Sequence, residues 1–421
     1  MWLKKYLLVG ILVSGIIIGL YGVSFSQETV SFAHWTVGEE SFDKFWDVLQ
    51  RDFEKEYPNI KVVRVEIPRG RYWDQITVVS IVGPAPDVVG VTPPYVKQWI
   101  AMEAVESLEE WMDLTEIKRT FVEQQRTFCM EKGKTYAVVQ GARSLILIYN
   151  EKLFEEAGIK NPPSSPEELV ATSMKLTQPE KGQYGIELRT NVKNYSNVYD
   201  RLLVFPAGYG GNYAKDGVPT ATDPNTIRGI KLYKLLFDLK VGPAVDSKVA
   251  REMLFKGKLA MIIDGPWNFT QAEATAPETY PHLMAAMTPF PNKATIGGAH
   301  HFLIIPTLAK NKSAGGKFIQ FCMRDKYQRL YSKFGGVMPG NLENTSEELL
   351  KNRWYRPFVE AMNHAVMGIP PGCGLIASEF TRIVVEHVCG EIALKGEPVE
   401  ETMEKCQRKL MKLVEGEGAV D

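Results

Sequence analysis

The sequence has no excess of charge of one sign. Its 421 residues include 49 Lys and Arg against 50 Asp and Glu, which gives a net charge of −1. A nucleic-acid-binding surface would need clustered basic residues, so this class of protein is not expected. Low-complexity and repeated segments are also missing, which excludes fibrous and repeat architectures. The length exceeds that of one ordinary hydrophobic core, so two or more cores are expected.

Cysteine is scarce, and its spacing excludes the common metal and redox motifs. No two cysteines are closer than sixteen positions, so no C-x-x-C element exists. We expect most of them to be small buried apolar residues. The H-E-x-x-H, G-x-S-x-G and P-loop elements are missing as well. No metal ion and no cofactor is therefore predicted. The five positions are Cys129, Cys322, Cys373, Cys389 and Cys406.

Only the start of the chain carries a long hydrophobic run. Lys4 and Lys5 precede an apolar run over residues 6–23, and small residues at Ser24 and Ser26 follow it. This arrangement predicts a signal peptide at residues 1–26, and hence export to the periplasm or the cell surface. A single spanning helix is the alternative, because eighteen apolar residues can cross a bilayer. No cysteine lies near residue 26, so the usual lipid-attachment signal is missing.

Strand and helix patterns alternate along the remaining chain. Residues 29–35 are rich in β-formers and predict an opening strand. Apolar residues at helical spacing over 42–53 predict a helix. Apolar and polar residues alternate over 60–67, which predicts the next strand. Ser165-Pro166 and Asp223-Pro224 are typical helix starts, with a capping side chain followed by proline. The pattern predicts an α/β fold with parallel strands joined by crossover helices.

Five stretches resemble elements of one known family. In this order and spacing they are similar to the extracellular solute-binding proteins of ABC importers, in the group that includes the maltodextrin-binding proteins. The stretches are Phe53–Val62, Gly83–Val89, Tyr149–Gly158, Phe255–Met261 with Gly265-Pro266-Trp267, and Gly297-Gly298 with Lys310–Lys312 and Lys317–Phe321. Together they extend over nearly the whole chain after residue 26.

The resemblance implies a two-lobed periplasmic-binding-protein-like fold of type II, in which each lobe is a β-sheet flanked by helices. Lobe 1 would comprise residues 28–140 plus 295–340, and lobe 2 residues 141–294 plus 341–421. The chain would cross between the lobes at Val139–Arg143, Pro291–Thr295 and Pro339–Asn344. Such crossings act as a hinge that closes the lobes around a ligand.

The ligand implied by the resemblance is a mono- or oligosaccharide. Sugar rings stack on aromatic planes, while their hydroxyl groups need convergent polar partners. Trp267 of the Gly-Pro-Trp element would face the cleft, and Trp35 ends the first strand, where ligands bind in open α/β sheets. Arg143 lies at a crossing, and its planar guanidinium group can donate hydrogen bonds to hydroxyl groups or to an anion. Further candidates for ligand contact are Asp87, Gly298, Trp354, Tyr355 and Trp73. The structural alternatives are a turn for Asp87, a helix face for Trp354 and Tyr355, and the core for Trp73.

The family also implies partners and leaves rival functions to be tested. The protein would act as a monomer, without enzymatic activity, and pass its ligand to transmembrane permease subunits driven by a cytoplasmic ATPase. Arg69, Arg71 and Arg143 leave open an anionic solute such as a glycerol phosphate. An exported glycoside hydrolase would need two catalytic carboxylates, and none lies in a recognisable catalytic element. A purely structural surface protein is the third alternative.

Overall fold

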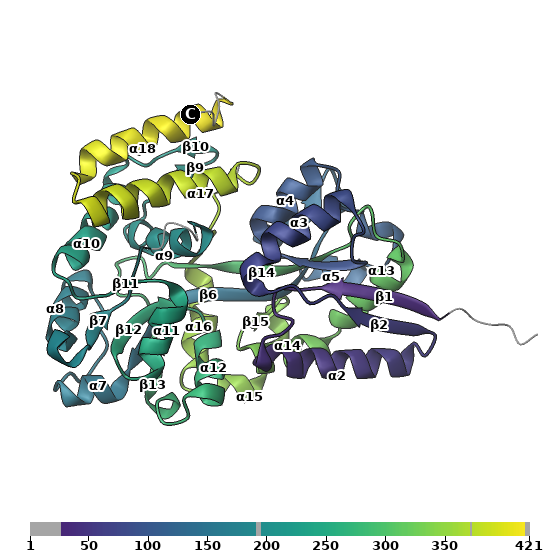
Figure 1. Ribbon diagram of the computed structural model, residues 1–421, viewed down its shortest axis with the longest axis horizontal. Helices are drawn as coiled ribbons and strands as arrows, with labels where there is room; N and C mark the ends of the chain where they lie inside the picture. The colour runs from purple at the N-terminus through teal and green to yellow at the C-terminus, as the bar shows by residue number, and fades with distance from the viewer. Residues whose placement is uncertain (1–26, 191–194, 371–372, 417–421) are drawn as a thin grey trace, which may run out of the picture.

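The computed structural model describes residues 27–190, 195–370 and 373–416. Its central feature is a ten-stranded mixed sheet with the order β2-β1-β3-β14-β6-β12-β7, and helices cover it on both faces (Figure 1). Additional short strands join the sheet, β13 and β15 at β6 and β16 at β14. The predicted α/β class is confirmed.

The strands of this sheet are β1 (Glu28–Ala33), β2 (Ile60–Arg64), β3 (Val88–Val91), β6 (Val138–Asn150), β7 (Tyr184–Ile186), β12 (Leu259–Asp264), β13 (Leu283–Ala286), β14 (Thr295–Ile304), β15 (Met338–Pro339) and β16 (Ala365–Val366). The longer helices are α2 (Glu40–Glu56), α3 (Tyr72–Val82), α4 (Pro93–Ala101), α8 (Pro166–Leu176), α9 (Tyr195–Gly208), α10 (Pro224–Asp238), α11 (Ser247–Phe255), α12 (Trp267–Thr275), α13 (Lys312–Cys322), α14 (Asp325–Gly335), α17 (Ala377–Val385) and α18 (Val399–Val414). Shorter helices include η2 (Arg69–Arg71), α7 (Glu151–Glu156) and α16 (Tyr355–Ala361), and a π-helix, η8, spans Glu386–Leu394.

The buried apolar side chains divide into two groups. One group comes from residues 30–139 and 299–337, and Phe45, Trp46 and Trp99 are among its largest members. The other comes from residues 142–296 and 338–410 and includes Tyr199 and Phe269. We call the parts of the molecule around these groups lobe 1 and lobe 2. The lobe boundaries given by the sequence analysis stay a prediction. The two separate cores give a physical reason for the chain to divide into lobes near those boundaries.

Two long strands connect the lobes. β6 pairs with β14 through its first half, where Val139 lies opposite Phe302 and Arg143 opposite Gly298. Its second half pairs with β12 in lobe 2, from Ile146 opposite Asp264 onward. The hydrogen bonding of the sheet is therefore continuous through the crossing, and β6 and β14 bridge the two halves of the molecule in Figure 1.

Helix starts and cysteines follow their predicted chemistry. Ser165 Oγ accepts a hydrogen bond from the Glu168 amide at 3.1 Å, which caps α8, and the Asp223 side chain caps α10. All five cysteines are buried and unpaired with one another. Burial raises the pKa of the Cys389 thiol to about 12 and that of Cys373 to about 11. A buried thiol with a raised pKa forms little thiolate, so we expect these cysteines to be unreactive in the folded protein.

In the three described ranges, no helix combines the length and apolar character that a membrane crossing needs. The predicted signal peptide lies outside the described residues.

Candidate functional site

Trp267 lies between the two lobes. Asp264 ends β12, and after Gly265-Pro266 the helix α12 begins at Trp267. The indole is partly exposed and packs against the core of lobe 2 and the core of lobe 1. Its neighbours in α12, Asn268 and Phe269, are fully buried. Of these three side chains, only the Trp267 indole lies at the boundary between the lobes.

An aromatic wall in lobe 1 follows the end of β1. Trp35 stacks on His34 with ring centroids 4.0 Å apart and contacts Trp73 at 5.2 Å. Trp73 in turn stacks on Tyr95 at 4.6 Å with only 11° between the planes. Trp35 is 5% exposed, whereas Trp73 and Tyr95 are partly exposed. The structure thus brings Trp35 and Trp73 together, and it adds Tyr95, which the sequence analysis missed.

Histidines of the crossing strand β14 join this wall. An irregularity in the β14–β6 pairing falls at Ala299–Phe302, and it places both His300 and His301 near Trp35, at 6.3 and 4.8 Å between centroids. His301 Nδ1 and the Tyr331 hydroxyl lie 2.5 Å apart. Burial and neighbouring cationic side chains hold the pKa of both histidines well below its ordinary value. Both imidazoles are therefore neutral at physiological pH.

Arg143 and Gly298 are register partners at the point where the strands cross. Gly298 has φ = +109°, a backbone conformation that favours glycine. The Arg143 guanidinium forms an ion pair with Asp200 of α9, and both side chains are about nine-tenths buried. Gly368 passes so close that a Cβ there would lie 2.6 Å from Asp200 Oδ1. The Arg143 guanidinium is thus held by the Asp200 carboxylate, whose own position is restricted by the backbone at Gly368.

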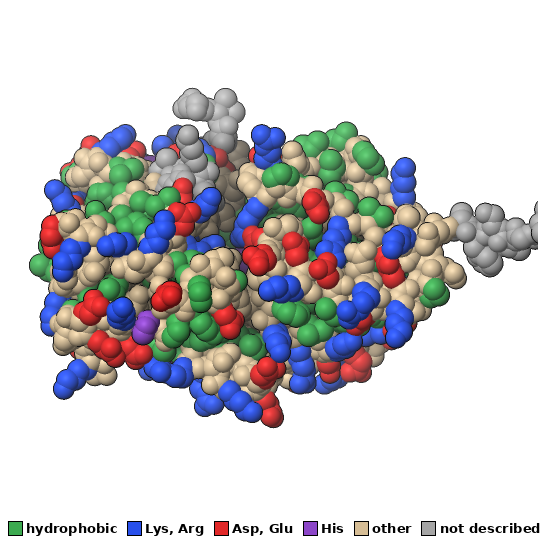
Figure 2. Space-filling model, turned by 60° about the horizontal axis from the view of Figure 1, so that its bottom comes forward, with side chains coloured by type: hydrophobic (Ala, Val, Ile, Leu, Met, Phe, Trp, Pro, Cys, Tyr) green, Lys and Arg blue, Asp and Glu red, His purple; other side chains and the backbone are tan. Residues whose placement is uncertain are grey.

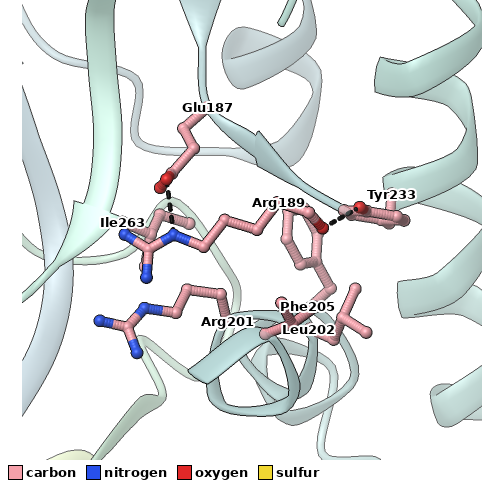
Figure 3. Close-up of a pocket in the computed structure, with 8 residues that line it drawn as sticks. Glu187, Arg189, Arg201, Leu202, Phe205, Tyr233 and Ile263 are labelled. Carbon is pink, nitrogen blue, oxygen red and sulfur yellow. Dashed lines mark hydrogen bonds and ion pairs between the residues drawn. The ribbon is translucent and has the colours of Figure 1, made fainter. Parts of the chain in front are cut away.

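A buried charge network supports the lobe 2 side of the boundary. The Arg189 Nε donates to Glu187 Oε1 at 2.5 Å, and its Nη2 donates to Asp264 Oδ2 at 2.7 Å. Arg201 Nη2 binds the other oxygen of Asp264 at 2.5 Å. Figure 3 shows both guanidinium groups directed to the same side of a small cavity of about 10 Å³, room for roughly one water molecule. Tyr233 closes the far end through a 2.8 Å bond to the Arg189 carbonyl.

The arginines decide the protonation of the carboxylates in this network. Burial alone would raise the pKa of Asp264, but the charges of Arg201 and Arg189 bring it far below its ordinary value. Glu187 responds differently, because burial raises its pKa and Arg189 offsets only part of that rise. Asp264 is consequently an anion that fixes two cations beside the start of α12. The sequence analysis missed this network, whose only signal was Asp264 directly before Gly-Pro-Trp.

Three other predicted contact residues have structural partners of their own. Asp87 is 2% exposed, and its carboxylate accepts hydrogen bonds from the Ser31 amide and hydroxyl, both at 2.8 Å, and from the Asn311 amide at 2.7 Å. It joins β1 to the start of α13 rather than facing the boundary. Its alternative role in organising a turn therefore fits the structure.

Trp354 and Tyr355 belong to the core of lobe 2. Trp354 is 7% exposed and stacks on Phe269 with centroids 4.4 Å apart and 5° between the planes. Tyr355 is fully buried, and its hydroxyl donates to the Val337 carbonyl at 3.3 Å. Packing alone accounts for the positions of both aromatic side chains, and their role in ligand contact stays a prediction.

A second hollow lies outside the lobe boundary. It has a volume of about 760 Å³ and is lined by residues 31–86 alone, beneath α3 and beside Pro84. In the space-filling view the molecule is also hollowed where its two halves meet, and basic and acidic side chains are interspersed over the visible face (Figure 2). The convergent aromatic and charged side chains lie at the boundary, so we place the candidate site there.

The comparisons with known proteins agree with this architecture. A putative binding protein of Brucella abortus (strain 2308) is 26% identical over 319 residues, which cover 73% of this chain and 75% of the relative. A maltooligosaccharide ABC transporter solute-binding lipoprotein of Streptococcus pneumoniae (strain R6) is 26% identical over 330 residues, covering 75% of this chain and 73% of the relative. A solved ABC transporter solute-binding protein from Thermotoga lettingae, bound with α-D-tagatose, superposes with a TM-score of 0.81 at 20% identity, over 92% of this chain and 99% of that one.

The family match extends over most of the chain. Residues 49–354 match the model of a family described as bacterial extracellular solute-binding protein. This range includes the crossing strands, the aromatic wall from Trp73 onward, and Trp267. The chain belongs to the bacterial extracellular solute-binding protein family.

Proposed function

We propose that the protein is an exported receptor that captures a carbohydrate between its lobes and delivers it to an ABC importer. The observation that supports this proposal is the position of Trp267, between the two cores and on the opposite side of the boundary from Trp35 and Trp73. Aromatic planes on both sides suit a sugar ring, whose two faces carry C–H groups. The names of the relatives point the same way, because one is a solute-binding lipoprotein of a maltooligosaccharide ABC transporter.

Closure would take place about the two crossing strands. Their paired backbones bend as a unit, so the lobes can approach while the core of each lobe stays packed. The proposed contact set comprises Trp267, Trp35, Trp73 and Gly298, with Arg143 as a positioned cation. The proposed partners are transmembrane permease subunits with a cytoplasmic ATPase, and the receptor acts as a monomer.

Binding without chemical change is part of the proposal. A glycoside hydrolase needs one carboxyl group that can give up a proton and a second that acts as nucleophile or base. Asp264 is bound by two arginines and Asp200 by Arg143, so neither is free to protonate a leaving group. Glu187 keeps its raised pKa in the interior of lobe 2, where only a cavity of about 10 Å³ adjoins it.

Calorimetry and tryptophan emission test the proposal. A panel of mono- and oligosaccharides is titrated into the protein, and closure over Trp267 should change the indole emission on binding. Trp267→Ala should weaken binding at least about tenfold, because a stacked ring is lost. Trp111→Phe is the matched control, since Trp111 packs only against lobe 1. Absence of binding to every saccharide, or equal affinity of Trp267→Ala and the wild type, would refute the proposal.

A further inference from the structure

The Trp267 indole lies over the backbone of Gly265. A Cβ built on Gly265 would lie 2.1 Å from both Cζ3 and Cη2 of the indole and 2.6 Å from its Cε3. These are three consecutive atoms of the six-membered ring, and a point so close to all three lies over the face of the ring rather than beyond its edge. The indole therefore folds back over the glycine, whose backbone covers one of its two faces.

The backbone conformation at Gly265 does not itself require glycine. Its φ lies outside the left-handed region, so an alanine could adopt the same conformation. Pro266 restricts the residue before it to extended conformations, which are open to alanine as well. The three atoms nearest to the added Cβ all belong to Trp267. The contact with the indole is thus the feature that excludes a side chain at residue 265.

Hydrogen bonds hold Gly265 through both of its backbone polar groups. Its amide donates to Asp264 Oδ1 at 2.8 Å, and its carbonyl accepts from Asn268 Nδ2 at 2.9 Å. Asp264 and Asn268 are both 0% exposed. Asp264 is in turn bound by Arg189 and Arg201. The surface on which the indole lies is therefore fixed by the buried charge network of lobe 2.

Lobe 1 contacts the same turn. A Cβ built on Gly336, directly after α14, would lie 3.0 Å from the Pro266 carbonyl oxygen and 3.0 Å from Cγ2 of Thr270. The Trp267 indole also packs against the core of lobe 1. The turn thus lies in the contact between the lobes. A change in the direction of the indole would change the surface that lobe 2 presents to lobe 1 and to a ligand.

We infer that Gly265 is the positioning residue of the sugar platform, because its missing side chain lets the Trp267 indole lie flat on a fixed backbone. The inference rests on the proposed function and adds a determinant of specificity to it. An indole that is already held in one direction loses little conformational freedom when a ligand binds, which favours affinity. With one face covered by the backbone, the indole can stack on one sugar ring at a time.

The alanine variant of this glycine tests the inference. In Gly265→Ala the added methyl group would overlap the six-membered ring, so the indole must turn away from its position. For any saccharide that the wild type binds, calorimetry should show an affinity lower by about tenfold or more, because the stacking contact is lost. The near-ultraviolet circular dichroism of the unliganded protein should also change, and this change should be missing when Trp267 is alanine.

Combination with Trp267→Ala separates positioning from a role in the turn. In that background the methyl group meets no ring, so Gly265→Ala should change the remaining affinity by no more than about twofold. Gly265→Ala should lower the melting temperature when the indole is present. Without the indole the melting temperature should stay the same or rise, because alanine restricts the unfolded chain more than glycine does. Gly390→Ala is the control, since a Cβ there meets no atom within 4 Å, and it should act alike in both backgrounds.

The outcomes separate the inference from the proposed function. If a saccharide binds the wild type and Gly265→Ala equally well, the inference fails and the carbohydrate receptor stands. If Gly265→Ala lowers the melting temperature equally with and without the Trp267 indole, the inference also fails, since the glycine then serves the turn alone. If no saccharide binds the wild type, the carbohydrate receptor fails, whereas the melting temperatures still decide whether Gly265 positions the indole.

Discussion

Replacing Asp264 with asparagine should destabilise lobe 2 severely. The two side chains have nearly the same shape, but asparagine carries no charge to compensate Arg189 and Arg201, whose side chains are 2% and 7% exposed. Removing one partner of a buried ion pair costs about 3–5 kcal/mol, because the remaining charge stays buried without compensation. For a folding unit of this size the loss corresponds to roughly 6–20 °C in melting temperature.

Asp238→Asn is the matched control for this substitution. Asp238 accepts from Lys234 at 2.6 Å, four residues earlier on α10, and its side chain is 52% exposed. Exposed pairs of this kind contribute about 0–1 kcal/mol, so the control should unfold almost as the wild type does. Urea unfolding of all three proteins, followed by far-ultraviolet circular dichroism, gives the free energies of unfolding.

A small effect would contradict the reasoning. If Asp264→Asn and Asp238→Asn lose similar stability, or if Asp264→Asn stays within about 1 kcal/mol of the wild type, the carboxylate does not compensate two buried cations. The position of α12, and with it the argument for Trp267, would then need another explanation.

Two further predictions follow from the titrating groups. The pKa of Asp264 is lower in the folded protein than in the unfolded chain, so the stabilisation by its carboxylate is present above about pH 4 and is lost as the pH falls below that value. The difference in unfolding free energy between the wild type and Asp264→Asn should therefore narrow on acidification. A difference that stays constant in urea titrations from pH 7 to pH 3 would contradict this direction of the pKa shift. The buried thiols, with pKa values raised by burial, should not react with Ellman's reagent at pH 8 in the native protein, whereas all five should react in 8 M urea; rapid reaction of a native thiol would show that its site opens.

Local sequence chemistry predicted the elements whose partners are close along the chain. Capping side chains followed by proline gave the starts of α8 and α10, and apolar spacing gave α2. The family resemblance of the Gly-Pro-Trp element singled out Trp267, and the structure packs this indole against both cores. The pairing of Arg143 with Gly298 was not predicted as a contact, although both positions were singled out.

The charge network could not be predicted because its partners are distant in sequence. Asp264 meets Arg201 and Arg189 across 63 and 75 positions, and only the folded chain brings them together. The aromatic candidates show a different difficulty. Trp354 and Tyr355 are as suited to a core as to a sugar platform, and composition alone does not separate these environments. Burial and stacking on Phe269 do.

The route of β14 has a consequence for the order in which the protein folds. β3 pairs with β14 at Val89 opposite Ile304. The strand β14, which lies in the middle of the sheet of lobe 1, is therefore synthesised more than two hundred residues after β3. Contacts of such long sequence separation form slowly. The growing chain therefore cannot complete its first lobe until most of it has left the ribosome. Under the proposed export, this delay lengthens the interval in which an unfolded chain is available to the translocation channel.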